Sequence, residues 1–178
     1  MTLNTIFYKL INLIRFNFQT QDYLTKIIAN QGLIYFNSRD IDDKLPFNSY
    51  GFSVFSQYDE DGLIDILING FDDISRDFIE FGVDDFNEAN CRFLIESLLW
   101  KGAIFEGNKK AFRRMQVRDF YWKKNLVINN KFLDIENIQS AISDICNNNN
   151  FGILSVDVDG IDWYLLEKSL IFKPSIVI

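Results

Sequence analysis

Three segments of this sequence join acidic side chains to glycine, and they hold most of the residues suited to chemistry. They read Glu80-Phe81-Gly82-Val83-Asp84, Glu106-Gly107-Asn108 and Asp157-Val158-Asp159-Gly160-Ile161-Asp162. The chain contains no histidine. This excludes a Ser-His-Asp triad, an HExxH zinc site and imidazole acid-base catalysis within these residues. Proton transfer must therefore use Asp, Glu, Lys, Tyr, Cys or a metal-bound water.

The first two segments favour a nucleoside ligand without phosphates. Gly82 permits a tight turn and close approach of a ligand, but residues 82–87 lack the GxGxxG pattern that binds a pyrophosphate. Asp84 and Asp85 would repel a diphosphate, which disfavours NAD, FAD and a nucleotide-sugar oxidoreductase. Glu106 stands where an acid binds ribose hydroxyls. S-adenosylmethionine meets both conditions. The alternative is that Glu80 and Glu106 only cap helices.

The acids of the third segment allow two chemical roles. Asp157 is a candidate general base for a hydroxyl acceptor. Alternatively, Asp157, Asp159 and Asp162 together hold Mg²⁺, which prefers oxygen ligands and would acidify a hydroxyl. The structural alternative is that residues 159–160 form a turn and Asp162 caps a helix. Trp163 and Tyr164 follow directly, and we expect them to pack in the core rather than to flank a sugar.

An alternation of strands and helices must position these acids. Apolar runs and helical spacing predict strands at 78–81, 102–105, 125–128, 152–156 and 175–178, and helices at 63–68, 88–99, 109–121, 135–146 and 162–170. Since β-α-β connections are right-handed, the expected fold is α/β, with a Rossmann-like, doubly wound, mostly parallel sheet. The acids then meet at the carboxyl ends of the strands, where such sheets bind ligands.

The N-terminal part differs from this pattern. We expect residues 1–50 to be a helical extension and residues 51–178 to be the Rossmann-like domain. Lys9 and Arg15 interrupt the first apolar stretch, so neither a transmembrane segment nor a signal peptide is expected. An amphipathic helix that packs on the body of the protein or on a partner, including a homo-oligomer, is predicted by Leu3, Phe7, Leu10, Ile11 and Ile14. Peripheral membrane contact is the alternative.

Composition narrows the class of partner. The 178 residues carry 18 Lys and Arg against 25 Asp and Glu, a formal net charge of −7 and a pI of about 4.6. This acidic balance disfavours nucleic-acid binding. Hydrophobic residues make up 48%, which excludes a long disordered chain. Cys91 and Cys146 form neither a disulfide framework nor a CxxC pair, so we expect reduced thiols in a cytoplasmic protein.

The strand-end segments resemble the FkbM-type S-adenosylmethionine-dependent methyltransferases. That family's pattern runs acid-x-Gly, Ser-Asn-Thr and Gly-Trp-x-Gly-x-x-x-Glu, after a Ser-Gln-x-x-Glu-Asp lead-in and before Asp-Val-Glu-Gly-x-Glu. The matching segments here are Phe55-Ser56-Gln57 with Glu60-Asp61-Gly62, Glu80-Phe81-Gly82, Ala89-Asn90-Cys91, Trp100 to Glu106, and Val156 to Gly160 with Asp162. The similarity covers about residues 52–178. It departs near Phe86, where the family has a second glycine, and at Ser155, where the family has lysine.

The resemblance implies a divergent methyltransferase that O-methylates a carbohydrate or related small molecule, as in polysaccharide biosynthesis. Its cofactor-binding residues would be Gln57, Asp61, Glu80, Gly82, Asp84, Asn90, Glu106, Gly107 and Asp157. Because such sheets have two further strands, the resemblance also predicts a chain truncated at its C-terminus. The alternative is a non-catalytic methyltransferase-like domain that serves for binding or scaffolding.

Overall fold

The chain forms two compact units, Met1–Arg39 and Asp40–Ile178. A computed structural model describes residues 3–39, 42, 44–71, 73–122, 125–146 and 150–178. The first unit is one continuous helix, α1 (Leu3–Ser38). The 3-10 helix η1 (Phe47–Tyr50) packs against α2 (Glu60–Asn69), so the second unit begins before residue 50. None of the helices in the described ranges is long and apolar enough to cross a membrane.

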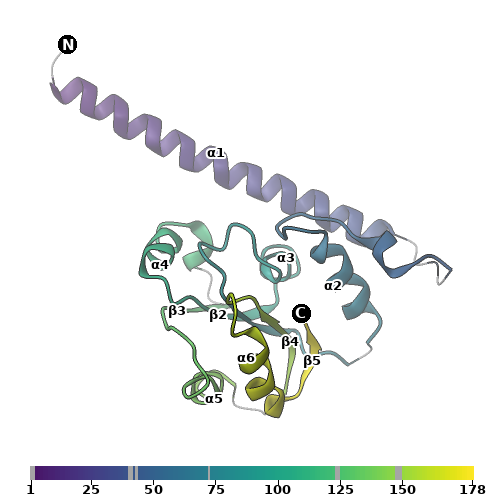
Figure 1. Ribbon diagram of the computed structural model, residues 1–178. Coiled ribbons are helices and arrows are strands. Elements are labelled where there is room, and N and C mark those ends of the chain that lie inside the picture. Colours follow the sequence, from purple (N-terminus) through teal and green to yellow (C-terminus); the bar gives the residue numbers. More distant parts are fainter. Residues whose placement is uncertain (1–2, 40–41, 43, 72, 123–124, 147–149) are drawn as a thin grey trace. The chain divides into compact units, whose positions relative to one another are not determined.

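The second unit is built on five parallel strands in the order β3-β2-β1-β4-β5 (Figure 1). They are β1 (Asp77–Phe81), β2 (Lys101–Phe105), β3 (Leu126–Asn129), β4 (Phe151–Val156) and β5 (Pro174–Val177). This confirms the α/β prediction, and each strand lies within one residue of its predicted bounds. The strands follow short apolar runs because the central ones are buried on both faces.

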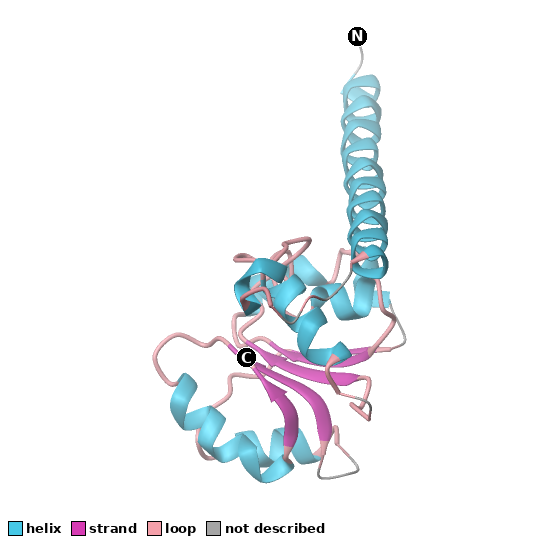
Figure 2. Cartoon of the chain, turned by 90° about the vertical axis from the view of Figure 1, so that its right-hand side faces the viewer, coloured by secondary structure: helices cyan, strands magenta, loops and turns pink. Residues whose placement is uncertain are grey.

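Helices cover both faces of the sheet, and three of them are much shorter than predicted. α3 (Arg92–Glu96) and α4 (Lys109–Met115) lie on one face, and α5 (Ile138–Ser143) and α6 (Asp162–Ser169) on the other (Figures 1 and 2). The 3-10 helices η2 (Asp119–Trp122) and η3 (Leu170–Phe172) follow α4 and α6. The sequence prediction began α3 at residue 88. It was wrong because tertiary hydrogen bonds hold residues 89–91 in a turn, from the Ala89 N–H to the Phe55 carbonyl and from the Asn90 and Cys91 N–H groups to Glu80.

The core holds the central strands in place. Phe81 and Phe105 meet edge to face on the side covered by α5 and α6, with ring centroids 5.6 Å apart. Phe93 and Met115 are buried, from α3 and α4. Because buried side chains fix β1, β2 and β4 along their length, the carboxyl ends of these strands leave the core at fixed positions.

The expectation that Trp163 and Tyr164 pack in the core is wrong. Trp163 is 72% exposed and Tyr164 is 57% exposed. α6 instead buries Leu165 and Ser169, which are one helical turn apart. Only one face of this short helix meets the sheet, and the two aromatic residues lie off that face.

Candidate functional site

A cavity of about 620 Å³ lies at the carboxyl edge of the sheet. The ends of β1, β2 and β4 and the loop after β3 form its walls. Among the predicted site residues, those that line it are Gly82, Asp84, Glu106, Gly107, Asp157 and Asp159. The loop after β3 adds Lys131, Phe132 and Leu133, which sequence reasoning missed because no motif marks them. The structure therefore brings acids from three strand ends into one cavity.

Gly82 joins the ends of β1 and β4. Its φ is +75°, and a Cβ atom there would overlap the carbonyl oxygen of Asp157. The Gly82 N–H donates to the Phe105 carbonyl at 3.0 Å, and the Asp157 N–H donates to the Phe81 carbonyl at 3.1 Å. These contacts hold the ends of β1, β2 and β4 together, and only glycine fits at this position.

Glu106 is buried at the end of β2, with one carboxylate oxygen in use. Its Oε1 accepts a hydrogen bond from the Asn108 N–H at 2.6 Å. Among the residues that the structure describes, Oε2 accepts none. The Asn108 side chain caps α4 by accepting from the Lys110 N–H at 2.8 Å. Glu106 is therefore not the cap of α4, and its second oxygen is available to a ligand.

The acids of the β1–α3 loop are paired with a cation. Arg114 of α4 donates from Nη2 to Asp84 Oδ1 at 2.7 Å and from Nε to Asp85 Oδ2 at 3.2 Å. Arg114 therefore compensates part of the negative charge of Asp84 and Asp85, the charge that was predicted to repel a diphosphate. Phe86 is fully buried with a φ of 60° and meets Phe120 edge to face at 5.2 Å. The backbone thus has a glycine-like conformation at Phe86.

Glu80 lies beneath the loop and does not line the cavity. Its Oε1 accepts from the Asn90 N–H at 2.8 Å and the Ser155 hydroxyl at 3.2 Å, and its Oε2 accepts from the Cys91 N–H at 3.2 Å. The Asn90 Nδ2 also donates to Ser155 Oγ at 3.2 Å. Burial raises the pKa of Glu80 to about 7. Glu80 therefore anchors the start of α3, which is the helix-end role that the sequence left open.

The raised pKa of Glu80 makes stability depend on pH. The folded protein keeps the Glu80 proton up to about pH 7, whereas the unfolded chain loses it near 4.5. The free energy of unfolding should therefore fall as pH rises from about 4.5 to 7, with Glu80 contributing about 3 kcal/mol to the decrease. Urea unfolding at a series of pH values measures this. Glu80→Gln should flatten the profile, and equal slopes in the two proteins would contradict the assignment.

The predicted lead-in residues also lie away from the cavity. Asp61 is buried in the first turn of α2, and its Oδ2 accepts three backbone N–H groups at 2.6–3.0 Å from residues 54–56. Burial raises its pKa. Gln57 is exposed. The Ala89 N–H donates to the Phe55 carbonyl at 3.1 Å, so Asp61 shapes a loop that supports the segment before α3.

The acids after β4 have separate roles. Partial burial, with the charges of Asp159 and Asp162, raises the pKa of Asp157. Asp162 accepts from the Val158 N–H at 2.8 Å and the Gly160 N–H at 3.0 Å, and the hydrogen bond from Val158 is the main reason that its pKa is lowered. From its place in the first turn of α6, Asp162 thus stabilises the loop of residues 158–160. In the described part of the chain, no three His, Cys, Asp or Glu side chains are placed to hold a metal ion.

Arg92 is a buried residue that sequence reasoning missed. Its Nη1 donates to the Asn87 carbonyl at 2.7 Å, and its guanidinium lies 4.3 Å from the centroid of the Phe55 ring. Burial lowers its pKa to about 10. An arginine before the apolar run of residues 93–95 is a weak indication of this role. Arg92 ties the loop before α2 to the loop before α3.

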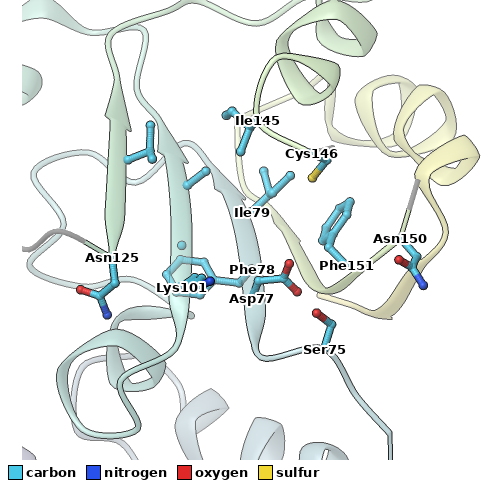
Figure 3. A pocket seen from close by; sticks show the side chains of 13 residues that line it. Ser75, Asp77, Phe78, Ile79, Lys101, Asn125, Ile145, Cys146, Asn150 and Phe151 are labelled. Atoms are coloured by element: carbon cyan, nitrogen blue, oxygen red, sulfur yellow. The ribbon is translucent and has the colours of Figure 1, made fainter. Parts of the chain in front are cut away.

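A second cavity, of about 710 Å³, lies at the amino edge of the sheet (Figure 3). Asp77 and Lys101 are opposite one another on β1 and β2, and Ile79 and Ala103 are opposite one another two residues further along. Cys146 stands at the side of this cavity. Because open parallel sheets bind ligands at the carboxyl ends of their strands, the carboxyl-edge cavity is the candidate site.

A scan against protein-family models finds no match for this chain, and a search of curated proteins finds none either. The fold places the chain among α/β proteins with an all-parallel sheet, compatible with a Rossmann-like fold.

Proposed function

We propose that the chain is an S-adenosylmethionine-dependent methyltransferase of the FkbM type that O-methylates a carbohydrate or related small molecule. The observation that carries the proposal is Glu106, which lines a cavity of about 620 Å³ and whose Oε2 lacks a hydrogen-bond partner among the described residues. A cavity of this size is typical of small-molecule sites, which are roughly 300–1,000 Å³. A carboxylate with a free oxygen suits ribose hydroxyls.

The other lining residues fit the rest of such a cofactor. Phe132 is 71% exposed and offers an aromatic face for adenine stacking. A Cβ at Gly107 would be 2.9 Å from Phe132 Cδ2, so Gly107 lets this ring approach β2. Asp157 and Asp159 add negative charge that suits the sulfonium group of S-adenosylmethionine, a charge that S-adenosylhomocysteine lacks.

When bound, S-adenosylmethionine supplies an electrophilic methyl group. Asp157 takes the proton of the acceptor hydroxyl, and its raised pKa makes it a stronger base than an ordinary aspartate. The hydrogen bond from its N–H to the Phe81 carbonyl fixes its backbone beside Gly82. Asp162 holds the turn that follows. The proposed mechanism requires no magnesium ion.

Cofactor binding tests the proposal directly. Isothermal titration calorimetry of the full chain with S-adenosylhomocysteine should give one binding site, and the ligand should raise the thermal unfolding temperature. If the titration gives no heat and the ligand gives no thermal shift, that result would count against the methyltransferase and favour the non-catalytic binding domain.

The role of Asp157 predicts a separation of activity from binding. Asp157→Asn should reduce methyl transfer about 10²- to 10⁴-fold, the usual contribution of a general base, with little change in S-adenosylhomocysteine affinity. Asp159→Asn is the matched control, since residue 159 lines the same cavity. At saturating S-adenosylmethionine it should keep activity, with the pH profile moved to lower pH because one charge that raises the pKa of Asp157 is gone. Equal losses in both variants would contradict the assignment.

A further inference from the structure

Helix α1 exposes large apolar side chains along most of its length. Monomeric proteins rarely leave so extended an apolar surface uncovered. Ten of these side chains are between 42% and 68% exposed, namely Ile6, Phe7, Leu10, Leu13, Ile14, Leu24, Ile27, Ile28, Ile34 and Tyr35. Ile11, Phe16 and Tyr23 are exposed as well and lie beside this stripe.

The ten side chains follow a heptad repeat, written abcdefg with Phe7 at a. The a positions are Phe7, Ile14, Gln21, Ile28 and Tyr35. The d positions are Leu10, Asn17, Leu24 and Gln31, and the g positions are Ile6, Leu13, Thr20, Ile27 and Ile34. A repeat of seven residues over two turns is typical of left-handed coiled coils. The a and d positions form a seam from residue 7 to residue 35, about 42 Å long at 1.5 Å per residue.

We propose that this seam binds the seam of a second copy of the chain in a parallel, two-stranded coiled coil. Three polar residues interrupt the seam, at Asn17, Gln21 and Gln31. In a parallel, in-register pair each meets its own copy, and the amide groups hydrogen-bond to one another. A partner with a wholly apolar seam would leave all three amides buried and unpaired, which is costly.

The polar residues also select the orientation. An antiparallel pair can place Asn17 opposite Gln21, but the same register places Gln31 opposite Phe7. Isoleucine at a and leucine at d favour two strands, and this combination occurs at residues 14 and 28 and at residues 10 and 24. Parallel pairing is therefore the arrangement that satisfies every polar position of the seam.

Charge and area agree with pairing between identical helices. The charged side chains Lys9, Arg15, Asp22 and Lys26 take positions c, b, b and f, outside the seam. Between residues 6 and 35 the e and g positions carry no charge, so no charged side chain beside the seam repels a second copy. Half-exposed side chains of this size hide on the order of 100 Å² each, or about 1,000 Å² per chain. A standard interface buries about 800 Å² on each partner.

Analytical ultracentrifugation of the full chain tests the proposal. Wild type should sediment as a dimer, at twice 20.9 kDa. Ile14→Asp with Leu24→Asp, at a and d, should sediment as a monomer of 20.9 kDa. The matched control, Asn12→Asp with Gln19→Asp at f positions, adds the same charge and should remain dimeric. A monomeric wild type, or equal dissociation of both double variants, would overturn the proposal.

Cross-linking gives a test that does not depend on a disruptive substitution. Leu10→Cys should form a covalent dimer under oxidation, because parallel pairing brings residue 10 beside its copy. Gln19→Cys, at an outer position, should give only the background of wild type, whose Cys91 is buried and whose Cys146 is half-buried. No cross-link in Leu10→Cys would overturn the parallel pairing. A monomeric protein that binds anionic lipid vesicles through α1 would assign this face to a membrane surface instead.

Discussion

Replacing Gly82 with alanine is expected to destabilise the Asp40–Ile178 unit by about 2–5 kcal/mol, from left-handed strain and overpacking together. The new Cβ would overlap the Asp157 carbonyl oxygen, which is backbone and lies at the end of a buried strand. Relief requires the ends of β1 and β4 to move apart. Since both ends line the candidate site, S-adenosylhomocysteine binding should be lost as well. Urea unfolding and calorimetry measure the two effects.

Gly160→Ala separates the two causes of that loss. Gly160 also has a positive φ, +98°, but a Cβ there meets no atom within 4 Å. Its substitution should cost only about 1–2 kcal/mol, the penalty of left-handed backbone. If the two variants lose equal stability, the contact between Gly82 and Asp157 is not what requires glycine.

Replacing Glu106 with glutamine or alanine is expected to weaken S-adenosylhomocysteine binding about 10- to 100-fold, the worth of a hydrogen bond to a charged group. Glutamine keeps one acceptor oxygen for the Asn108 N–H but loses the carboxylate oxygen offered to the ribose. Alanine loses both and leaves the Asn108 N–H without its acceptor. The loss should therefore be larger in Glu106→Ala than in Glu106→Gln.

Glu167→Gln is the matched control for Glu106. Glu167 is exposed on α6 and does not line the cavity, so its substitution makes the same change of charge away from the site. Calorimetry should give it the affinity of wild type. Unchanged affinity in both Glu106 variants would refute the placement of the ribose, and with it the observation on which the proposed function rests.

The strands were predictable from sequence, and the helix starts were not. Runs such as Phe78–Phe81 are buried on both faces of a parallel sheet, so composition alone marks them. The start of α3 depends instead on Glu80, which takes the N–H groups of Asn90 and Cys91 from across the fold. Residues 88–91 have helical composition, but hydrogen bonds to a distant carboxylate compete with helix formation there.

The site shows the same division. The order of strands and helices in the sequence placed Gly82, Glu106 and Asp157 at the carboxyl ends of strands. A parallel sheet gathers these ends at one edge, whatever segments connect the strands. Which acids face a cavity and which are buried beneath it depends on side-chain direction. Glu80 and Asp61 match a motif as well as Glu106 does, yet both are buried away from the cavity and accept backbone N–H groups there. Phe132 lies in no motif and lines the cavity because the loop after β3 crosses Gly107.

The sequence by itself determined the α/β class, the absence of histidine chemistry and the strand ends at which the acids gather. These follow from local apolar runs, from composition and from the handedness of β-α-β connections. Only the tertiary structure decided that one carboxylate oxygen of Glu106 stays free, whereas both oxygens of Asp162 accept backbone N–H groups. It also decided that Arg114 pairs with Asp84 and Asp85. The physical reason is that each depends on groups far apart in the chain, whose distances only folding sets.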